Sequence, residues 1–202
     1  MLDIFRSKEE ITEEEIDEAL QFANEQILFN LPEFTYSCQN HSSIDNFYET
    51  CENNQWTCGF WPGEVWLSYE NTKLEKLKLA GLILVESFLD RIENKIEVDH
   101  HDMGFLYSLS CVSAYKLTGN DRAKKAAILA AEQLISRYQE VGEFIQAWGE
   151  LNAPDNYRYI IDCLLNLPLL YWATEETGND KFKLIADKHI NTCLKYSIRE
   201  DG

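Results

Sequence analysis

The segment VDHHDMGF, residues 98–105, brings two aspartates and two histidines into eight positions. Such residues suit a metal site, a catalytic carboxylate with a neighbouring histidine, or a polar turn in which Asp99 or Asp102 caps a helix. Metal ligands on a helix are three or four residues apart, whereas the adjacent side chains of His100 and His101 diverge by about 100°. We therefore predict no metal and no cofactor. The segment alone does not separate a catalytic carboxylate from a cap.

A third aspartate, Asp162, lies in the apolar stretch YIIDCLLNLPLLYW. Burial there would favour its protonated form unless Arg158, one helical turn earlier, pairs with it. A protonated carboxyl beside an ionised one is what general acid catalysis near neutral pH requires. Capping is the alternative role for Asp162 as well, so two separated aspartates remain a weak motif by themselves.

The tryptophans divide by their surroundings. Trp66 and Trp172 lie within apolar helical runs, and we predict that they pack in the core. Trp56 and Trp148 lie in the glycine-flanked segments QWTCGFW and IQAWGE, which precede apolar helices. Exposed aromatic rings at the mouth of a cavity are suited to stacking on a sugar ring.

Helical patterns must position these residues. A cap-like Thr12 and Glu15 begin an amphipathic helix over residues 9–30, and residues 31–58 read as a long polar loop. Three segments then share one design, an apolar helix, a polar turn and an amphipathic helix, with LTGND and ETGND as the clearest turns. We find no strand signal. The pattern predicts an all-α chain of stacked hairpins, either an open solenoid or a closed toroid.

The repeat also predicts where the candidate residues meet. Trp56, Asp102 and Asp162 lie sixteen, sixteen and fifteen residues before the threonine of their respective turns. Equivalent positions in stacked repeats converge on one surface. We therefore expect one aromatic ring and two carboxylates at the same mouth of the assembly.

Composition limits the partners. The 202 residues carry a formal charge of −17, which repels nucleic acid and anionic membrane surfaces, so we expect neither as a partner. The six cysteines form no C-x-x-C pair, and the acidic N-terminal segment does not look like a signal peptide. We predict a cytoplasmic protein with reduced thiols.

Four segments, in order and spacing, resemble the unsaturated glucuronyl hydrolases, glycoside hydrolase family 88: WTCGFWPGEVWLSYE, DHHDMGFLYSLS, IQAWGE and YIIDCLLNLPLLYWATEETGN. The resemblance runs from about residue 10 to the end of the chain. It implies an (α/α)6 barrel, a toroid of six helical hairpins. It also implies an enzyme that removes the 4,5-unsaturated uronic acid from the non-reducing end of lyase-generated glycosaminoglycan oligosaccharides.

In that family an acid protonates the vinyl ether at C4, water adds at C5, and the hemiketal opens and expels the sugar. The resemblance assigns the general acid and base to Asp162 and the second essential carboxylate to Asp102. It places Trp56 and Trp148 at the sugar subsite, His101 beside the second aspartate, and Arg158 among the substrate-binding residues.

Family members are about twice as long as this chain. The resemblance therefore implies that residues 1–202 form a single incomplete domain, the N-terminal half of the barrel with about seven helices. A half barrel would expose apolar edges that favour self-association, and alone it would have little or no activity. Two alternatives stay open: an unsaturated rhamnogalacturonyl hydrolase, or a non-catalytic helical-repeat scaffold that binds a partner.

Overall fold

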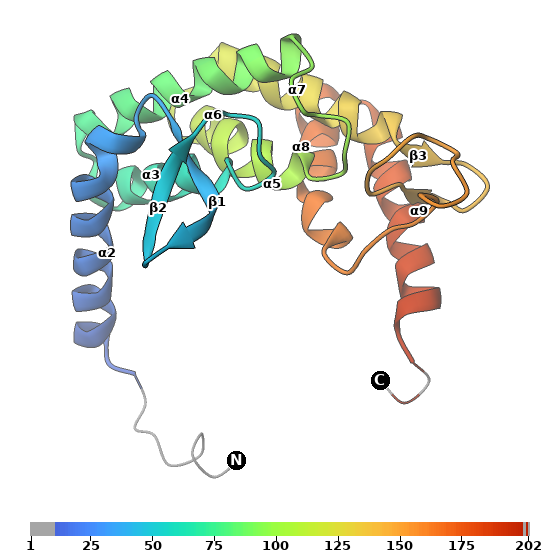
Figure 1. Cartoon of the computed structure of the whole chain (residues 1–202), viewed down its shortest axis with the longest axis horizontal. Helices are drawn as coiled ribbons and strands as arrows, with labels where there is room; N and C mark the ends of the chain where they lie inside the picture. Colours follow the sequence, from blue (N-terminus) through green and yellow to red (C-terminus); the bar gives the residue numbers. More distant parts are fainter. Residues whose placement is uncertain (1–10, 200, 202) are drawn as a thin grey trace.

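A computed structural model describes residues 11–199 and residue 201, and in it the chain forms an arch of helices (Figure 1). A π-helical turn, Ser108–Val112, joins α5 and α6 into one continuous rod, and a 3₁₀ turn, Cys163–Asn166, leads into α8. The described residues thus contain seven helical rods, as the repeat predicted. Their bounds are α2 (Glu13–Phe34), α3 (Phe60–Thr72), α4 (Glu75–Glu93), α5 (Met103–Tyr107), α6 (Ser113–Thr118), α7 (Asp121–Ser136), α8 (Pro168–Thr177) and α9 (Asp180–Ser197).

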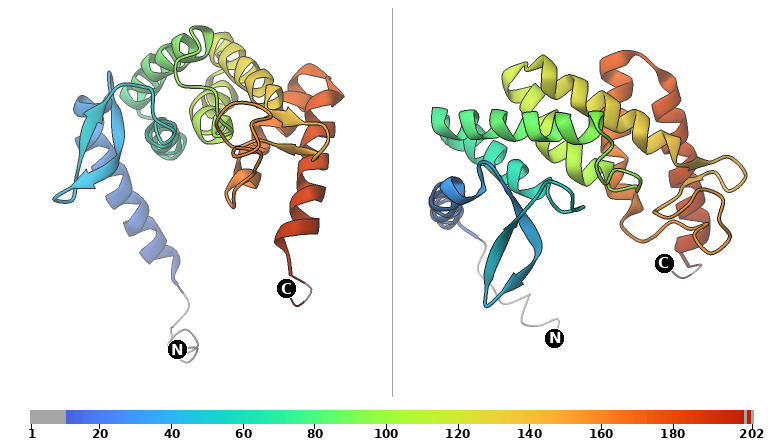
Figure 2. Two further views of the ribbon diagram at one scale, coloured as in Figure 1. Left: turned by 45° about the vertical axis from the view of Figure 1, so that its right-hand side comes forward. Right: turned by 45° about the horizontal axis from the view of Figure 1, so that its top comes forward.

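The helices pair into hairpins that stack side by side. α3 packs against α4, α8 packs against α9, and α7 contacts both α4 and α8. Figures 1 and 2 show α4 and α7 along the convex side of the arch, with α3, α5 and α6 beneath them. One face of α7 consists of buried small residues, which allow its backbone to approach the inner helices closely: Ala123, Ala126, Ala127, Ala130 and Ala131.

The three helix–helix turns are built by the same local chemistry. Gly119 and Gly178 end their helices in the left-handed region, at φ of 69° and 70°, and Lys73 takes that place in the first turn at 56°. Asn120 and Asn179 then cap α7 and α9 through their side-chain oxygens. In each turn a threonine hydroxyl also donates to the carbonyl four residues earlier. These bonds satisfy helix-end groups locally, which is why a short motif marks each turn.

The first described helix begins as the sequence predicted but ends later. Thr12 and Glu15 form a complete capping box at the start of α2. Residues 9 and 10 lie outside the described residues. Pro32 does not end the helix, which continues to Phe34 because a proline this near the C-terminus disturbs only the last turn.

The prediction of a strand-free polar loop over residues 31–58 is wrong. Strands β1 (Cys38–Ile44) and β2 (Phe47–Cys51) form an antiparallel hairpin, and a second small hairpin pairs β3 (Tyr138–Gln139) with β4 (Phe144–Ile145). The first hairpin turns at Asp45 and Asn46, both at positive φ, the signature of a type I′ turn. Its strands are mostly exposed and polar, so they lack the alternating apolar pattern by which a strand is usually found.

Within the described part of the chain, no helix combines the length and apolarity needed to cross a bilayer.

Candidate active site

The three equivalent repeat positions lie at the N-terminal ends of successive inner helices, as predicted. Asp102 is the residue before α5, Asp162 the residue before the 3₁₀ turn that leads into α8, and Trp56 lies in the loop before α3. Two glycines let these ends approach. A Cβ on Gly59 would lie 2.1 Å from the backbone oxygen of Phe105, and a Cβ on Gly104 would lie 2.2 Å from Cα of Asn166. Neither approach is open to a larger residue.

The two aspartates meet at the ring of His101. Its Nε2 lies 3.3 Å from Oδ1 of Asp102 and 3.7 Å from Oδ1 of Asp162. The ring is buried, and its backbone N–H donates to the carbonyl of Ala147 at 2.7 Å, which fixes its segment. The side chains of Asp102 and Asp162 are 13% and 27% exposed, so each keeps a path to solvent or substrate. The geometry places Nε2 of His101 between two carboxylates, without a hydrogen bond to either among the described residues.

Burial lowers the pKa of His101, and the two aspartates raise it only in part. The ring is therefore neutral near pH 7 and carries a single proton. Oδ1 of Asp162 is buried and has no hydrogen-bond partner within the described chain. This oxygen is therefore free to form a hydrogen bond with a ligand.

His100 also contacts Asp102. Its Nε2 lies 3.0 Å from the carbonyl oxygen of Glu97, which can only accept, so Nε2 carries a proton. Its Nδ1 accepts the backbone N–H of Asp102 at 3.1 Å and lies 2.9 Å from Oδ2 of the same residue. Asp102 is thus flanked by two imidazole rings. Adjacent histidines can both reach it because residues 97–102 form a loop, in which the helical divergence of neighbours does not apply.

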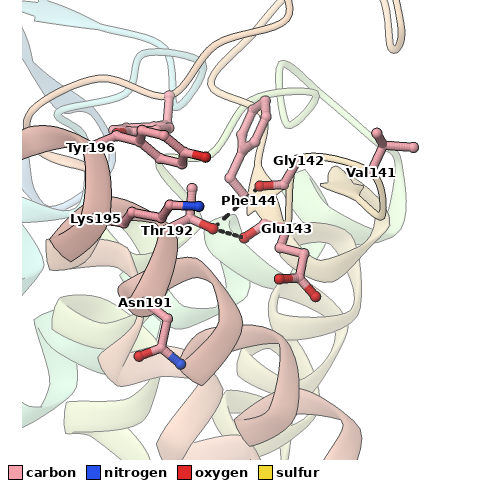
Figure 3. Close-up of a pocket in the computed structure, with 9 residues that line it drawn as sticks. Val141, Gly142, Glu143, Phe144, Asn191, Thr192, Lys195 and Tyr196 are labelled. Carbon is pink, nitrogen blue, oxygen red and sulfur yellow. Dashed lines mark hydrogen bonds between the residues drawn. The ribbon is translucent and has the colours of Figure 1, made fainter.

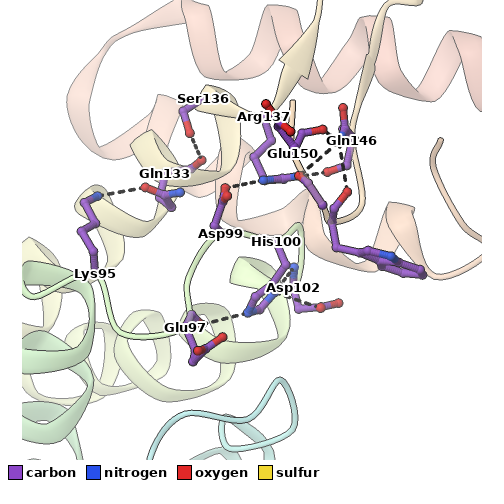
Figure 4. Close-up of polar contacts among 12 residues, drawn as sticks. Lys95, Glu97, Asp99, His100, Asp102, Gln133, Ser136, Arg137, Gln146 and Glu150 are labelled. Atoms are coloured by element: carbon purple, nitrogen blue, oxygen red, sulfur yellow. Dashed lines mark hydrogen bonds and ion pairs between the residues drawn. The ribbon is translucent and has the colours of Figure 1, made fainter. Parts of the chain in front are cut away.

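A buried arginine joins the two loops that carry the site (Figure 4). The Arg137 guanidinium is fully buried and donates to the carbonyls of Gln146 and Gly149, at 3.0 and 2.9 Å, and to the carboxylate of Asp99. The Gln146 amide in turn donates to the carbonyl of Trp148 at 3.0 Å. Arg137 therefore ties the loop before α5 to the loop of Trp148. No local sequence signal marked it, because its partners are distant in the chain.

The two loop tryptophans are exposed, whereas Trp66 and Trp172 are buried as predicted. Trp148 is 41% exposed and meets the ring of His101 edge-on, with ring centroids 6.4 Å apart. Trp56 is 47% exposed and packs edge-on against Phe105, three residues beyond Asp102. Trp148 therefore borders His101, Trp56 contacts the helix that follows Asp102, and both rings keep surface free for a ligand.

Arg158 does not pair with Asp162. Residues 158–160 are not helical, so the expected separation of one helical turn does not exist. The guanidinium instead lies over the ring of Trp148, 4.9 Å from its centroid, and donates to the Asn156 side chain. Arg158 is thus placed as a cation beside the exposed tryptophan, where it can meet an anionic ligand.

Among the described residues, two clusters carry atoms that could bind a metal. One consists of His101, Asp102 and Asp162, whose ligand atoms lie within 4.8 Å of one another; the expectation of no metal there stays a prediction. The second joins Cys163, His189 and Cys193. His189 Nδ1 accepts from the backbone N–H of Ile145, so its proton is on Nε2, which faces Cys193. A protonated Nε2 cannot ligate a metal, which favours a structural role for this cluster.

The hollow drawn in Figure 3 does not contain the candidate catalytic residues. It has a volume of about 420 Å³ and lies between the turn that joins β3 to β4 and the C-terminal half of α9. Thr192 closes one side by donating to the carbonyls of Gly142 and Glu143. None of the predicted site residues lines this hollow.

Known proteins match the chain closely. It is 44% identical over 192 residues to the unsaturated chondroitin disaccharide hydrolase of Streptococcus pneumoniae, covering 95% of this chain and 48% of that protein. The crystal structure of unsaturated glucuronyl hydrolase from Streptococcus agalactiae superposes with a TM-score of 0.95 at 43% identity, covering 98% of this chain and 50% of that one. The chain belongs to the unsaturated glucuronyl hydrolase family. No family model matches it.

The chain spans about half the length of the curated relatives it matches. The described helices are accordingly half of the α/α toroid of these hydrolases. Mutants of the Streptococcus agalactiae enzyme with asparagine in place of either of two aspartates have also been solved, one of them complexed with dGlcA-GalNAc6S.

Proposed function

We propose that the chain supplies the catalytic carboxylates of a hydrolase that removes the 4,5-unsaturated uronic acid from lyase-generated glycosaminoglycan oligosaccharides by vinyl-ether hydration. The observation that carries the proposal is the meeting of Asp102 and Asp162 at His101, beside the exposed ring of Trp148. The names of the relatives support the glucuronyl and chondroitin substrates over the rhamnogalacturonyl alternative and over a non-catalytic scaffold.

In the proposed reaction Asp162 donates its proton to C4 of the unsaturated ring. Water then adds at C5 and gives a proton back to Asp162, and the hemiketal opens and expels the sugar. Asp162 suits this role because one of its oxygens is buried without a partner while part of the side chain stays exposed. The two mutated aspartates of the Streptococcus agalactiae enzyme are sixty residues apart, as are Asp102 and Asp162, which supports the assignment.

Asp102 influences Asp162 through His101 and accepts hydrogen bonds from sugar hydroxyls. His101 remains neutral and holds its N–H between the carboxylates. Trp56 and Trp148 stack on the sugar. Arg158 on the face of Trp148 offsets, locally, the negative field that would repel an anionic substrate.

We also propose that the chain is one domain, the incomplete N-terminal portion of the barrel, and that it works in the cytoplasm. Tyr69 packs against both clusters of buried apolar residues, which supports a continuous core. All six cysteines are free thiols, which supports a reducing compartment.

A chimera tests the function. Residues 1–202 are fused to the remaining half of the Streptococcus pneumoniae relative, and the ultraviolet absorbance of an unsaturated chondroitin disaccharide is followed. We expect the absorbance to fall with time. Asp162→Asn should reduce the rate at least about a hundredfold, as expected for loss of a general acid, whereas Asp155→Asn, an exposed control in the same loop, should not.

A folded chimera in which Asp162→Asn keeps the parent rate would contradict the assigned mechanism. Parallel assays with an unsaturated rhamnogalacturonyl disaccharide separate the two substrate classes. The unfused chain should bind the chondroitin disaccharide without turning it over, which Trp148→Ala should weaken.

A further inference from the structure

A second buried arginine, Arg91 near the C-terminus of α4, is enclosed by the loop that follows this helix. Its backbone carbonyl accepts from the N–H of Ile96 at 2.9 Å. Its Nε donates to the carbonyl of Ile96 at 3.2 Å, and its Nη2 donates to that of Glu97 at 2.8 Å. Lys95 and Glu97 are held at φ of 56° and 43°, in the left-handed region that disfavours side chains. Such backbone persists where several contacts fix it, and the guanidinium supplies two of them.

The other side of the guanidinium holds the loop of Trp56. Nη1 donates to the carbonyl of Gln55, the residue before Trp56, at 2.9 Å and to the side chain of Asn53 at 3.0 Å. The Gln55 side chain in turn accepts from the backbone N–H of His41 on β1 at 2.9 Å. Arg91 is fully buried, and its neutral acceptors on both loops offset the cost of burying its charge.

A short series of hydrogen bonds also leads from Arg91 to Asp102. The carbonyl oxygen of Glu97 accepts from Nη2 of Arg91 and lies 3.0 Å from Nε2 of His100. Because a carbonyl oxygen only accepts, the proton of that second contact is on Nε2. Nδ1 of His100 is thereby left to accept the backbone N–H of Asp102, at 3.1 Å. Arg91 thus helps to orient the imidazole ring that lies against Asp102.

The loop that leads to Asp102, residues 94–102, is therefore held between two buried arginines. Arg91 binds the start of this loop, and Arg137 binds its middle. With its remaining donors, each guanidinium binds the loop of one exposed tryptophan, Arg91 that of Trp56 and Arg137 that of Trp148. The two arginines thus connect one shared loop to two different aromatic rings.

We propose that Arg91 is a positioning residue for the sugar site, which fixes the place of Trp56 relative to Asp102; the inference rests on the function proposed above. Arg91 is buried and acts without touching the sugar, through the carbonyls that it binds on both loops. A substrate that stacks on Trp56 while it contacts Asp102 spans these two loops. A shift of one loop against the other therefore weakens its binding.

Kinetic coupling in the chimera tests the proposal. Arg91→Met removes every side-chain donor but keeps an unbranched chain, and we expect it to raise KM about tenfold and to lower kcat less. Added to Trp56→Ala, the same substitution should raise KM by less than about threefold further, because the ring that Arg91 positions is already gone. Added to Trp148→Ala, it should still raise KM about tenfold, because Arg91 does not bind that loop.

Arg137 provides the matched control, since it is equally buried and binds the same loop. Arg137→Met should show the reverse pattern, with coupling to Trp148→Ala and independence from Trp56→Ala. A general loss of stability would couple each arginine equally with both tryptophans. Arg91→Lys should also raise KM, because a single ammonium group keeps the charge but cannot replace a guanidinium fork that reaches both loops.

A measurement without turnover separates this inference from the proposed function. In a two-dimensional proton–nitrogen NMR spectrum of the 202-residue chain, Arg91→Met should shift the indole N–H signal of Trp56 more than that of Trp148. Arg137→Met should do the reverse. Far-ultraviolet circular dichroism checks that each variant folds, and Arg91→Lys replaces Arg91→Met if the latter unfolds.

Equal shifts of the two indole signals overturn the positioning role of Arg91. Additive effects of Arg91→Met and Trp56→Ala on KM overturn it as well. A chimera that turns over no substrate contradicts the proposed function instead, and the indole signals of the 202-residue chain then decide the role of Arg91 by themselves.

Discussion

Arg137 should contribute far more to stability than an exposed arginine with the same kind of partner. Arg137 is fully buried and donates to two backbone carbonyls and to Asp99. Arg122 also pairs with a carboxylate, that of Glu86, but the two side chains are 60% and 50% exposed. The substitutions Arg137→Met and Arg122→Met therefore compare a buried guanidinium with an exposed one at equal loss of charge.

The expected cost follows from the partners that are left behind. Arg137→Met leaves the buried carbonyl of Gln146 and the partly buried carbonyl of Gly149 without their charged donor, at roughly 1.5 kcal/mol each, or about 3 kcal/mol together. Asp99 adds little because its side chain is 76% exposed and regains water. Arg122→Met should cost less than about 1 kcal/mol, the usual value of an exposed ion pair.

Urea unfolding followed by circular dichroism measures both variants. A loss of about 3 kcal/mol should lower the midpoint by about 1 M or more, while the Arg122 variant should stay close to the parent. Removing the desolvation cost of a buried guanidinium can offset the lost hydrogen bonds. If the two variants prove equally stable, that offset is complete, and Arg137 does not hold the loops of Asp99 and Trp148 as described.

Three further outcomes are expected. Gly104→Ala should destabilise the chain by about 1–3 kcal/mol in urea, because its Cβ meets backbone, while Gly63→Ala, whose Cβ meets a leucine side chain at 3.0 Å, should cost less; equal costs would contradict the close approach. Burial lowers the pKa of His189 from 6.5 to about 4, so the unfolded chain binds more protons between these pH values. Stability should be full above pH 6.5 and fall by up to about 3 kcal/mol towards pH 4, and His189→Gln should remove that part of the slope measured by urea titration. EDTA should leave the urea midpoint unchanged, and a fall reversed by zinc would contradict the prediction of no metal and place one at either of the two clusters of metal-ligand atoms.

Local chemistry explains what could be predicted about the fold. The capping box at Thr12 and the turns at Gly119 and Gly178 depend on hydrogen bonds within a few residues, so their sequences predict them directly. The repeat also allowed a prediction about residues that are distant in the sequence, because equivalent positions in stacked hairpins lie at the same end of the stack. It correctly predicted that Asp102 and Asp162 approach each other across sixty residues.

The sequence misled where the backbone or the partners were not local. The hairpin over residues 38–51 is held by backbone pairing and by a positive-φ turn at Asp45. Its polar side chains give no sequence pattern from which these features could be predicted. A pairing of Arg158 with Asp162 was considered because a helix was assumed there, whereas the chain is irregular and places the guanidinium over Trp148.

By itself, then, the sequence determined the helices, their turns, the repeat and the identity of the acidic residues, since each follows from near neighbours or from periodic spacing. Tertiary structure alone decided that His100 also contacts Asp102 and that Arg137 ties two distant loops. The physical reason is that a buried charged side chain is paired by residues that the fold brings close in space. Residues that are close in space can be far apart in the sequence, so local sequence patterns do not reveal them.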